Sequence, residues 1–386
     1  MRLNKAGVAF GSLTRQLWNE HGISIVTKVK AVSHCLAFTD GLGFVGLLSA
    51  LESLFSGYLS RLDVVLVELK SICRLELPSG NQMATFGEDW GYAQNAFGLL
   101  QCCGDLLLKF AMFQSNLSAS VLSRASIIQL FSSSSPWMPV SHVALHTYNY
   151  LVEHRPAEYQ QLVELIYQCE TASDSLLSGS HQRLVAFSDS CHDFAFNMLF
   201  VSLKENLLQI PTLKIWQAGT SDNEASSLVL PSFSLSPLTY ITQIGDRLLT
   251  LPQQLESYTS HDNPALEFAL KSSSLLFSGK PTVVSSHEPD VAYHWIHAIT
   301  EATMQMYIQQ ILNIPCLSHQ SSAQLATDIE YLCNVLTALE VTPSVTLNQI
   351  VVLLKAHPEQ FVMIAKDENI PSAIYTTVSQ IRGIDM

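Results

Sequence analysis

The chain has 386 residues, of which 48% are hydrophobic and only 14% charged, and its formal net charge is −13. Its 20 Lys and Arg residues are too few and too scattered to neutralise a phosphate backbone, which argues against a nucleic-acid-binding protein. Mean hydropathy is positive at +0.22. No uninterrupted apolar run reaches the roughly 20 residues that a membrane-spanning helix needs, so no transmembrane segment is predicted.

The first 30 residues carry five basic side chains and a single acidic one, Glu20. A weak transit peptide is one interpretation of this segment. We favour a helix with a basic outer face. No apolar core followed by a cleavage site is present, so no secretory signal is predicted.

Eight cysteines occur at irregular spacing and none of them forms a C-x-x-C pair. In a long chain without a secretory signal this pattern predicts reduced, mostly buried thiols in a cytosolic setting. The residues are Cys35, Cys73, Cys102, Cys103, Cys169, Cys191, Cys316 and Cys333.

Apolar residues recur every three or four positions through most of the chain, which is the repeat of an amphipathic helix. Three stripes are especially regular, and we interpret them as faces that pack into a core. They comprise Tyr159, Leu162, Val163, Ile166 and Tyr167; Leu184, Phe187, Cys191, Phe194, Met198 and Val201; and Leu325, Ile329, Leu332, Leu336 and Leu339.

Residues suited to helix starts precede several of these runs. Pro156 fits a first helical turn, and Ser236–Pro237 reads as an N-cap followed by an N1 proline. Ser321 followed by Gln324 matches a capping box, in which each side chain satisfies a free backbone N–H. Pro343–Ser344 opens a further helix.

Segments rich in Ser, Gly and Pro separate the helical runs, and no series of alternating strands is found. The sequence therefore predicts an all-α fold, an elongated stack of antiparallel helical bundles or an irregular α-solenoid with no significant sheet. We expect an N-terminal helical segment at 1–131, a middle bundle at 140–257, a loop at 258–288 and a C-terminal bundle at 289–386.

Gly41, Gly43 and Gly46 have the G-x-G-x-x-G spacing of a dinucleotide site, with an acid, Asp63, at about the distance of the ribose ligand. The fingerprint requires a strand before the glycines, and none is predicted here. We expect a helix start, capped from within Thr39–Asp40. A dinucleotide-binding enzyme remains a remote alternative.

His142 and His146 lie four residues apart, the spacing of two zinc ligands on one helix. Position 143 is Val where a zinc protease has its glutamate, and His154 is the nearest third histidine. The consecutive residues Cys191–Asp193 point in different directions on a helix. We therefore predict no catalytic, cofactor-binding or metal-binding residue, no cofactor and no enzymatic activity.

Three blocks of the sequence resemble a known family. Phe38–Tyr58, Phe233–Glu256 and Ala302–Phe361 are similar to the C-terminal half of subunit seven of the conserved oligomeric Golgi complex. The resemblance runs from about Val32 to the C-terminus, and Met1–Lys30 has no clear counterpart.

This resemblance implies a non-enzymatic subunit of a vesicle-tethering complex, built as a helical rod. Such a subunit acts by protein–protein interaction in retrograde intra-Golgi transport and keeps glycosylation enzymes in place. The implied partners are subunits five, six and eight of the second lobe, with SNARE and Rab proteins as further candidates. The implied location is the cytosol and the cytosolic face of Golgi membranes, as a peripheral protein. A generic cytosolic helical scaffold is the alternative.

Overall fold

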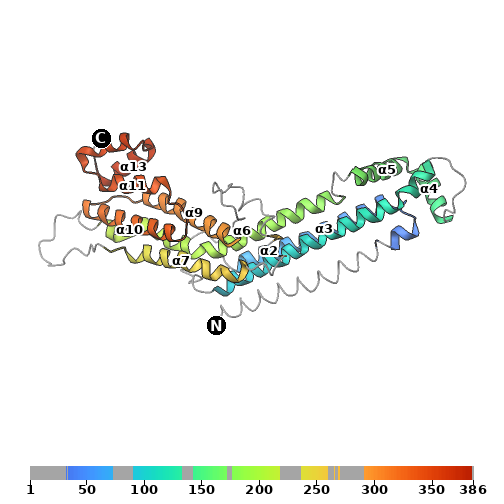
Figure 1. Cartoon of the computed structure of the whole chain (residues 1–386), viewed down its shortest axis with the longest axis horizontal. Coiled ribbons are helices and arrows are strands. Elements are labelled where there is room, and N and C mark those ends of the chain that lie inside the picture. Colours follow the sequence, from blue (N-terminus) through green and yellow to red (C-terminus); the bar gives the residue numbers. More distant parts are fainter. Residues whose placement is uncertain are drawn as a thin grey trace. The chain divides into compact units, whose positions relative to one another are not determined.

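A computed structural model describes residues 32, 34–72, 90–132, 142–171, 176–217, 236–259, 265, 268–269 and 291–384. Every regular element within these ranges is an α-helix or a short 3₁₀ helix, and none is a strand (Figure 1). The predicted all-α class is confirmed.

The chain forms two compact units. Unit 1 consists of residues 1–83, 89–198 and 261–279, and unit 2 of residues 84–88, 199–260 and 280–386. The boundaries of the three helical bundles expected from the sequence remain a prediction.

Unit 1 is built from long helices. They are α2 (Phe44–Ile72), α3 (Trp90–Ser132), α4 (His142–His154), α5 (Pro156–Thr171) and α6 (Ser178–Gln209), of which α6 contributes its residues up to 198. Helix α5 packs on α2, α3 and α4.

An aromatic cluster joins α2 to α3 in the core of unit 1. The ring of Phe55 lies 5.1 Å from Phe110 in an edge-to-face arrangement and 5.7 Å from Phe113. Such pairs add to the free energy gained from burying the rings themselves.

Within the described part of the chain, one segment, Ala93–Ala125 of α3, is long and apolar enough to cross a membrane. Just over half of its most apolar window is buried inside the protein. Within this segment, Asp105 and Lys109 pair with each other at 2.5 Å. The apolar character of α3 is thus used, in large part, in the core of unit 1.

Unit 2 contains the end of α6 and helices of up to 22 residues. They are η1 (Ile210–Thr212), η2 (Lys214–Gln217), α7 (Thr239–Thr259), α9 (Val291–Leu312), α10 (His319–Ala338), α11 (Val345–Lys355), η3 (Pro358–Gln360), α12 (Phe361–Asp367) and α13 (Ser372–Arg382). Helix α10 packs between α7 and α11, and α9 packs on α7. Trp216 is fully buried and donates its indole N–H to the carbonyl of Ile210 at 2.6 Å.

Two of the four expected helix starts agree with the sequence, and two, at Ser236 and Ser321, do not. Pro156 is the first residue of α5, and Ser344 is the N-cap of α11. The predicted capping box at Ser321 is wrong, because α10 starts earlier. Ser318 is its N-cap, and the Ser318 hydroxyl accepts from the backbone N–H of Ser321 at 3.2 Å.

The apolar stripes are core faces with one exception. In the stripes of α6 and α10 every residue is buried except the last of each, which is half-buried. In α5, Leu162 and Ile166 are buried, but Val163 and Tyr167 are exposed. The prediction that the whole α5 stripe faces a core is wrong, because no described element covers that side of the helix.

The described cysteines are all free thiols, as predicted, but most are not fully buried. Cys103 and Cys191 are buried, whereas Cys35 is exposed and the other four are half-buried. Burial raises the pKa of the Cys102 thiol to about 11, with a further contribution from Asp105. Little thiolate is therefore present at Cys102 near neutral pH. Cys73 lies outside the described residues.

Candidate functional site

The glycine-rich segment is a turn between two helices. Residues 34–38 before it are helical, so the strand required by a dinucleotide site is not there. The N–H of Gly43 donates to the Thr39 hydroxyl at 3.2 Å, directly before α2, so Thr39 satisfies a backbone N–H of the turn. A cap of α2 from within Thr39–Asp40 stays a prediction. Asp40 forms an ion pair with Arg124 of α3 at 3.3 Å.

The three glycines have unrelated surroundings. Gly41 has φ +90°, a conformation that favours glycine, and a Cβ there would lie 3.4 Å from Arg124. A Cβ on Gly43 would lie 3.2 Å from the Thr39 hydroxyl, and one on Gly46 would meet no atom within 4 Å. Backbone turning and packing account for Gly41 and Gly43, and nothing in the structure requires glycine at 46.

The histidine pair His142 and His146 lies exposed at the start of α4. No third potential ligand joins it, since the described ranges contain no cluster of three His, Cys, Asp or Glu residues suited to a metal. The ring of His154 instead stacks on Tyr150, with ring centroids 5.1 Å apart.

His192 is a buried structural residue of α6. Its Nδ1 lies 2.7 Å from the carbonyl oxygen of Ser188, one turn earlier. Burial lowers the pKa of His192, so the ring is neutral near pH 7. Cys191 is also buried while Asp193 is exposed, so the three consecutive side chains do not meet in one site.

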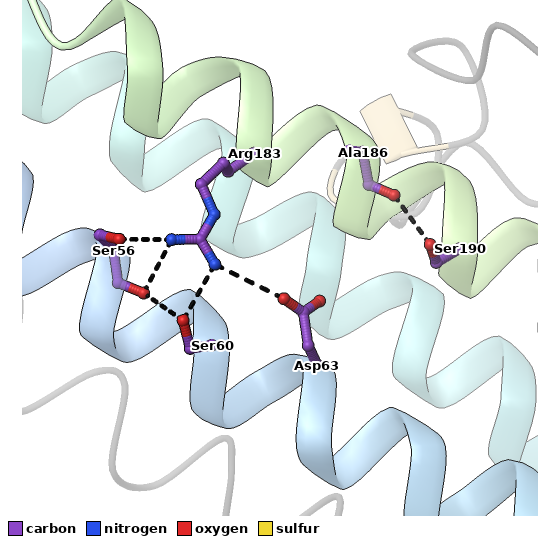
Figure 2. Close-up of polar contacts among 6 residues, drawn as sticks. All are labelled: Ser56, Ser60, Asp63, Arg183, Ala186 and Ser190. Carbon is purple, nitrogen blue, oxygen red and sulfur yellow. Dashed lines mark hydrogen bonds and ion pairs between the residues drawn. The ribbon is translucent and has the colours of Figure 1, made fainter.

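A polar seam holds the start of α6 on α2 (Figure 2). The guanidinium of Arg183 donates to the carbonyl of Ser56 at 3.1 Å and to its hydroxyl. It also donates to the Ser60 hydroxyl at 3.0 Å and lies 3.6 Å from the Asp63 carboxylate. One side chain therefore connects the two helices through backbone, hydroxyl and carboxylate groups.

We expect Arg183→Gln to lower the unfolding free energy by about 1 kcal/mol, because the seam is partly open to solvent. The measurement is the urea midpoint followed by circular dichroism. The control is Arg155→Gln, which removes an exposed pair with Glu158 within the α4–α5 connection. A midpoint shift equal to that of the control would show that the seam does not stabilise unit 1.

A second polar network lies in unit 2, where α10 caps the start of α7. The carboxylate of Asp328 accepts from the N–H of Leu238 at 2.9 Å and from Gln324 at 3.0 Å. Gln324 also donates to the carbonyl of Ser236 at 3.0 Å. The predicted local cap is wrong, because α7 begins at Thr239 and Asp328, 90 residues away, takes the role expected of Ser236.

Burial raises the pKa of Asp328 above its ordinary value of 3.8. The carboxyl group of Asp328 therefore binds its proton more tightly in the folded state than in the unfolded state. The associated stabilisation is complete below pH 3.8 and is lost as the pH rises through the raised folded value. We expect Asp328→Asn to keep the cap and remove this dependence, so that the variant gains stability relative to the parent as the pH rises from 4 to 7.

Asp328→Ala is the matched control, since it leaves the N–H of Leu238 without its acceptor and should destabilise by about 1–3 kcal/mol at either pH. Melting temperatures of the three proteins at pH 4 and 7 test both expectations. A difference between the parent and Asp328→Asn that does not change with pH would contradict the first.

Apolar side chains gather on the exposed sides of two helix pairs. On α4 and α5 they are Val143, Leu145, Tyr150, Val152, Val163 and Tyr167, and on α11 and α12 they are Val345, Val352, Val362 and Met363. Of these residues, periodicity had assigned only Val163 and Tyr167 to a core face. Clusters of exposed apolar side chains mark protein–protein contact sites.

Comparison with known proteins decides the family. Residues 20–383 match the family described as Golgi complex component 7. The chain belongs to this family. The resemblance found in the three sequence blocks is thereby confirmed.

Curated relatives of this chain are named conserved oligomeric Golgi complex subunit 7. The protein of Bos taurus is 36% identical over 379 residues, which cover 92% of this chain and 47% of the relative. That of Homo sapiens is 35% identical with the same coverage, and that of Arabidopsis thaliana is 25% identical over 370 residues, covering 86% and 42%. The chain thus spans about half the length of these relatives. No solved structure matches it.

Proposed function

We propose that this chain acts as a non-enzymatic subunit of a Golgi vesicle-tethering complex. In this proposal it works by protein–protein contact in retrograde intra-Golgi transport and in keeping glycosylation enzymes in place. The observation that carries the proposal is the family match over residues 20–383.

The described side chains support a scaffolding role. The polar groups of Arg183 and Asp328 connect helices to one another, and His192 bonds within its own helix. Exposed apolar residues on α4, α5, α11 and α12 offer surfaces for partners. We expect no enzymatic activity and no cofactor.

The partners we propose are other subunits of the tethering complex, with subunits five, six and eight of its second lobe first, and SNARE and Rab proteins as further candidates. The proposed location is the cytosolic face of Golgi membranes, where the protein is peripheral and exchanges with the cytosol.

Affinity purification with mass spectrometry tests this proposal, combined with imaging of the tagged chain. Tethering-complex subunits should co-purify, and part of the protein should overlap a Golgi marker. A version extended at its N-terminus to the length of the relatives is the matched comparison. A diffuse distribution, with none of these subunits recovered by either version, would overturn the proposal in favour of a scaffold outside the complex.

A further inference from the structure

Helix α4 buries little of its own apolar surface. Of its 13 residues, only Ala144 and Leu151 are buried, and its main neighbour is α5. An isolated helix of this length is marginal in water. Apart from buried Leu151 and half-buried Tyr148, its larger apolar side chains are exposed to solvent, as are two on α5. The small amount of apolar surface that α4 buries within the chain indicates that the α4–α5 pair buries more of it against a partner.

Apolar residues on one side of each helix, four of them exposed and two half-buried, form two stripes that meet. On α4 the spacing is three and then four residues, and on α5 it is four and four, so each set lies along one side of its helix. The rings of Tyr148 and Tyr159 join the stripes in an edge-to-face contact with centroids 5.5 Å apart. We call this surface the hairpin face: Leu145, Tyr148 and Val152 of α4 with Tyr159, Val163 and Tyr167 of α5.

Four of the six side chains are well exposed. Leu145 is 48% exposed, Val152 43%, Val163 46% and Tyr167 65%. Tyr148 and Tyr159 are half-buried where the stripes meet. The hairpin face therefore combines aliphatic groups with amphipathic aromatic rings, and of these side chains tyrosine is enriched in protein interfaces.

The charges around the hairpin face are negative. Helices α4 and α5 contain four carboxylates, and Arg155 is the single Lys or Arg in residues 142–171. That guanidinium is already paired with Glu158 at 2.6 Å. Glu153 directly follows Val152 and Glu164 directly follows Val163, so each stripe has an exposed acid beside it.

We propose that the hairpin face binds an amphipathic helix of a partner protein, one that presents an aliphatic stripe flanked by Lys and Arg. The aliphatic stripe would cover Val163, Tyr167 and their neighbours, and the basic side chains would meet Glu153 and Glu164. This surface is inferred from the chain's own side chains and does not depend on the Golgi assignment.

The carboxylates of Glu153 and Glu164 beside the hairpin face also determine which kinds of partner can bind there. A second copy of the same face would bring carboxylates against carboxylates, which costs free energy. The cytosolic leaflet of a membrane is anionic and attracts basic segments, so it too would be repelled. A basic amphipathic helix satisfies both the apolar centre and the charged border.

Binding of two synthetic helical peptides to the purified full chain tests the proposal by fluorescence anisotropy. Both peptides carry the same Leu stripe, with Lys around it in one and Glu in the other. The Lys peptide should bind at least tenfold more tightly, and its affinity should fall as salt increases. Absence of binding by the Lys peptide, or equal binding of the two, would overturn the proposal.

Two sets of variants place the binding on the hairpin face. Val163→Ser with Tyr167→Ser should weaken the Lys peptide by tenfold or more, whereas Val345→Ser with Met363→Ser, exposed residues of unit 2, should leave it unchanged. All four side chains are solvent-exposed, so the fold should survive, which melting temperatures verify.

Glu153→Lys with Glu164→Lys should shift the preference toward the Glu peptide.

Equal loss of binding in both serine pairs would place the site elsewhere. Sedimentation showing a dimer that dissociates in the Val163→Ser, Tyr167→Ser variant would assign the face to self-association. Flotation of the parent with phosphatidylserine vesicles, lost in the same variant, would assign it to a membrane. Equal loss in both serine pairs, such a dimer, or such flotation would each overturn the proposal.

Discussion

Ile329→Asp is expected to lower the unfolding free energy of unit 2 by about 4 kcal/mol, because it places an unpaired carboxylate in an apolar core. Ile329 is fully buried in α10, and its helical neighbours Leu325 and Leu332 are fully buried as well. The cost includes both the desolvation of the new charge and the loss of the packed isoleucine. The urea midpoint of the variant measures the effect.

Val345→Asp provides the control for this prediction. Val345 is 71% exposed at the start of α11, where a carboxylate is favourable near the helix N-terminus. Its midpoint should be unchanged or slightly raised. If Ile329→Asp unfolds at the same urea concentration as the control, then the α10 stripe does not face a core.

Gly104→Leu is expected to detach the residues around Ala265 from α3. A Cβ at position 104 would lie 1.8 Å from the backbone oxygen of Ala265 and 2.8 Å from the Cβ of Ala269, both in unit 1. These neighbours are backbone and a short side chain, so no rotamer change relieves the overlap. Leucine itself favours the helical conformation of α3, so Ala265 and Ala269 must move.

Amide hydrogen exchange reports this release directly. Exchange at Ala265 and Ala269 should accelerate by roughly tenfold or more, while the middle of α3 stays protected. Gly98→Leu is the control on the same helix, because a Cβ there would meet no atom within 4 Å. Unchanged exchange at Ala265 in the Gly104→Leu variant would show that the close approach is not required for the fold.

The contrast between Gly104 and the glycines at 41–46 shows how sequence spacing can mislead. The motif-like spacing drew a functional hypothesis to Gly41, Gly43 and Gly46, whereas Gly104 lies in an ordinary helical run without a pattern around it. Glycine matters at position 104 because the backbone of Ala265, more than 150 residues later in the chain, lies where a side chain would be. A single sequence contains no local signal for such an approach.

The exposure of individual side chains was equally impossible to predict from the sequence. Val163 and Tyr167 continue the stripe of Leu162 and Ile166 without a break in spacing, yet the first pair is exposed and the second buried. The 3.6-residue repeat defines the side of a helix on which a residue lies, but not which sides are covered. The hairpin face therefore became visible only once α3, α4 and α5 were placed around one another.

The sequence by itself determined the helical class, the position of several helices and the family, because periodicity and the three similar blocks are local properties of the chain. Only the tertiary structure decided that Asp328 caps α7, that the backbone of Ala265 lies directly against Gly104, and that one side of α5 is exposed to solvent. Each of these depends on which distant segments meet, and that is set by packing over the whole unit, which no local pattern of residues encodes.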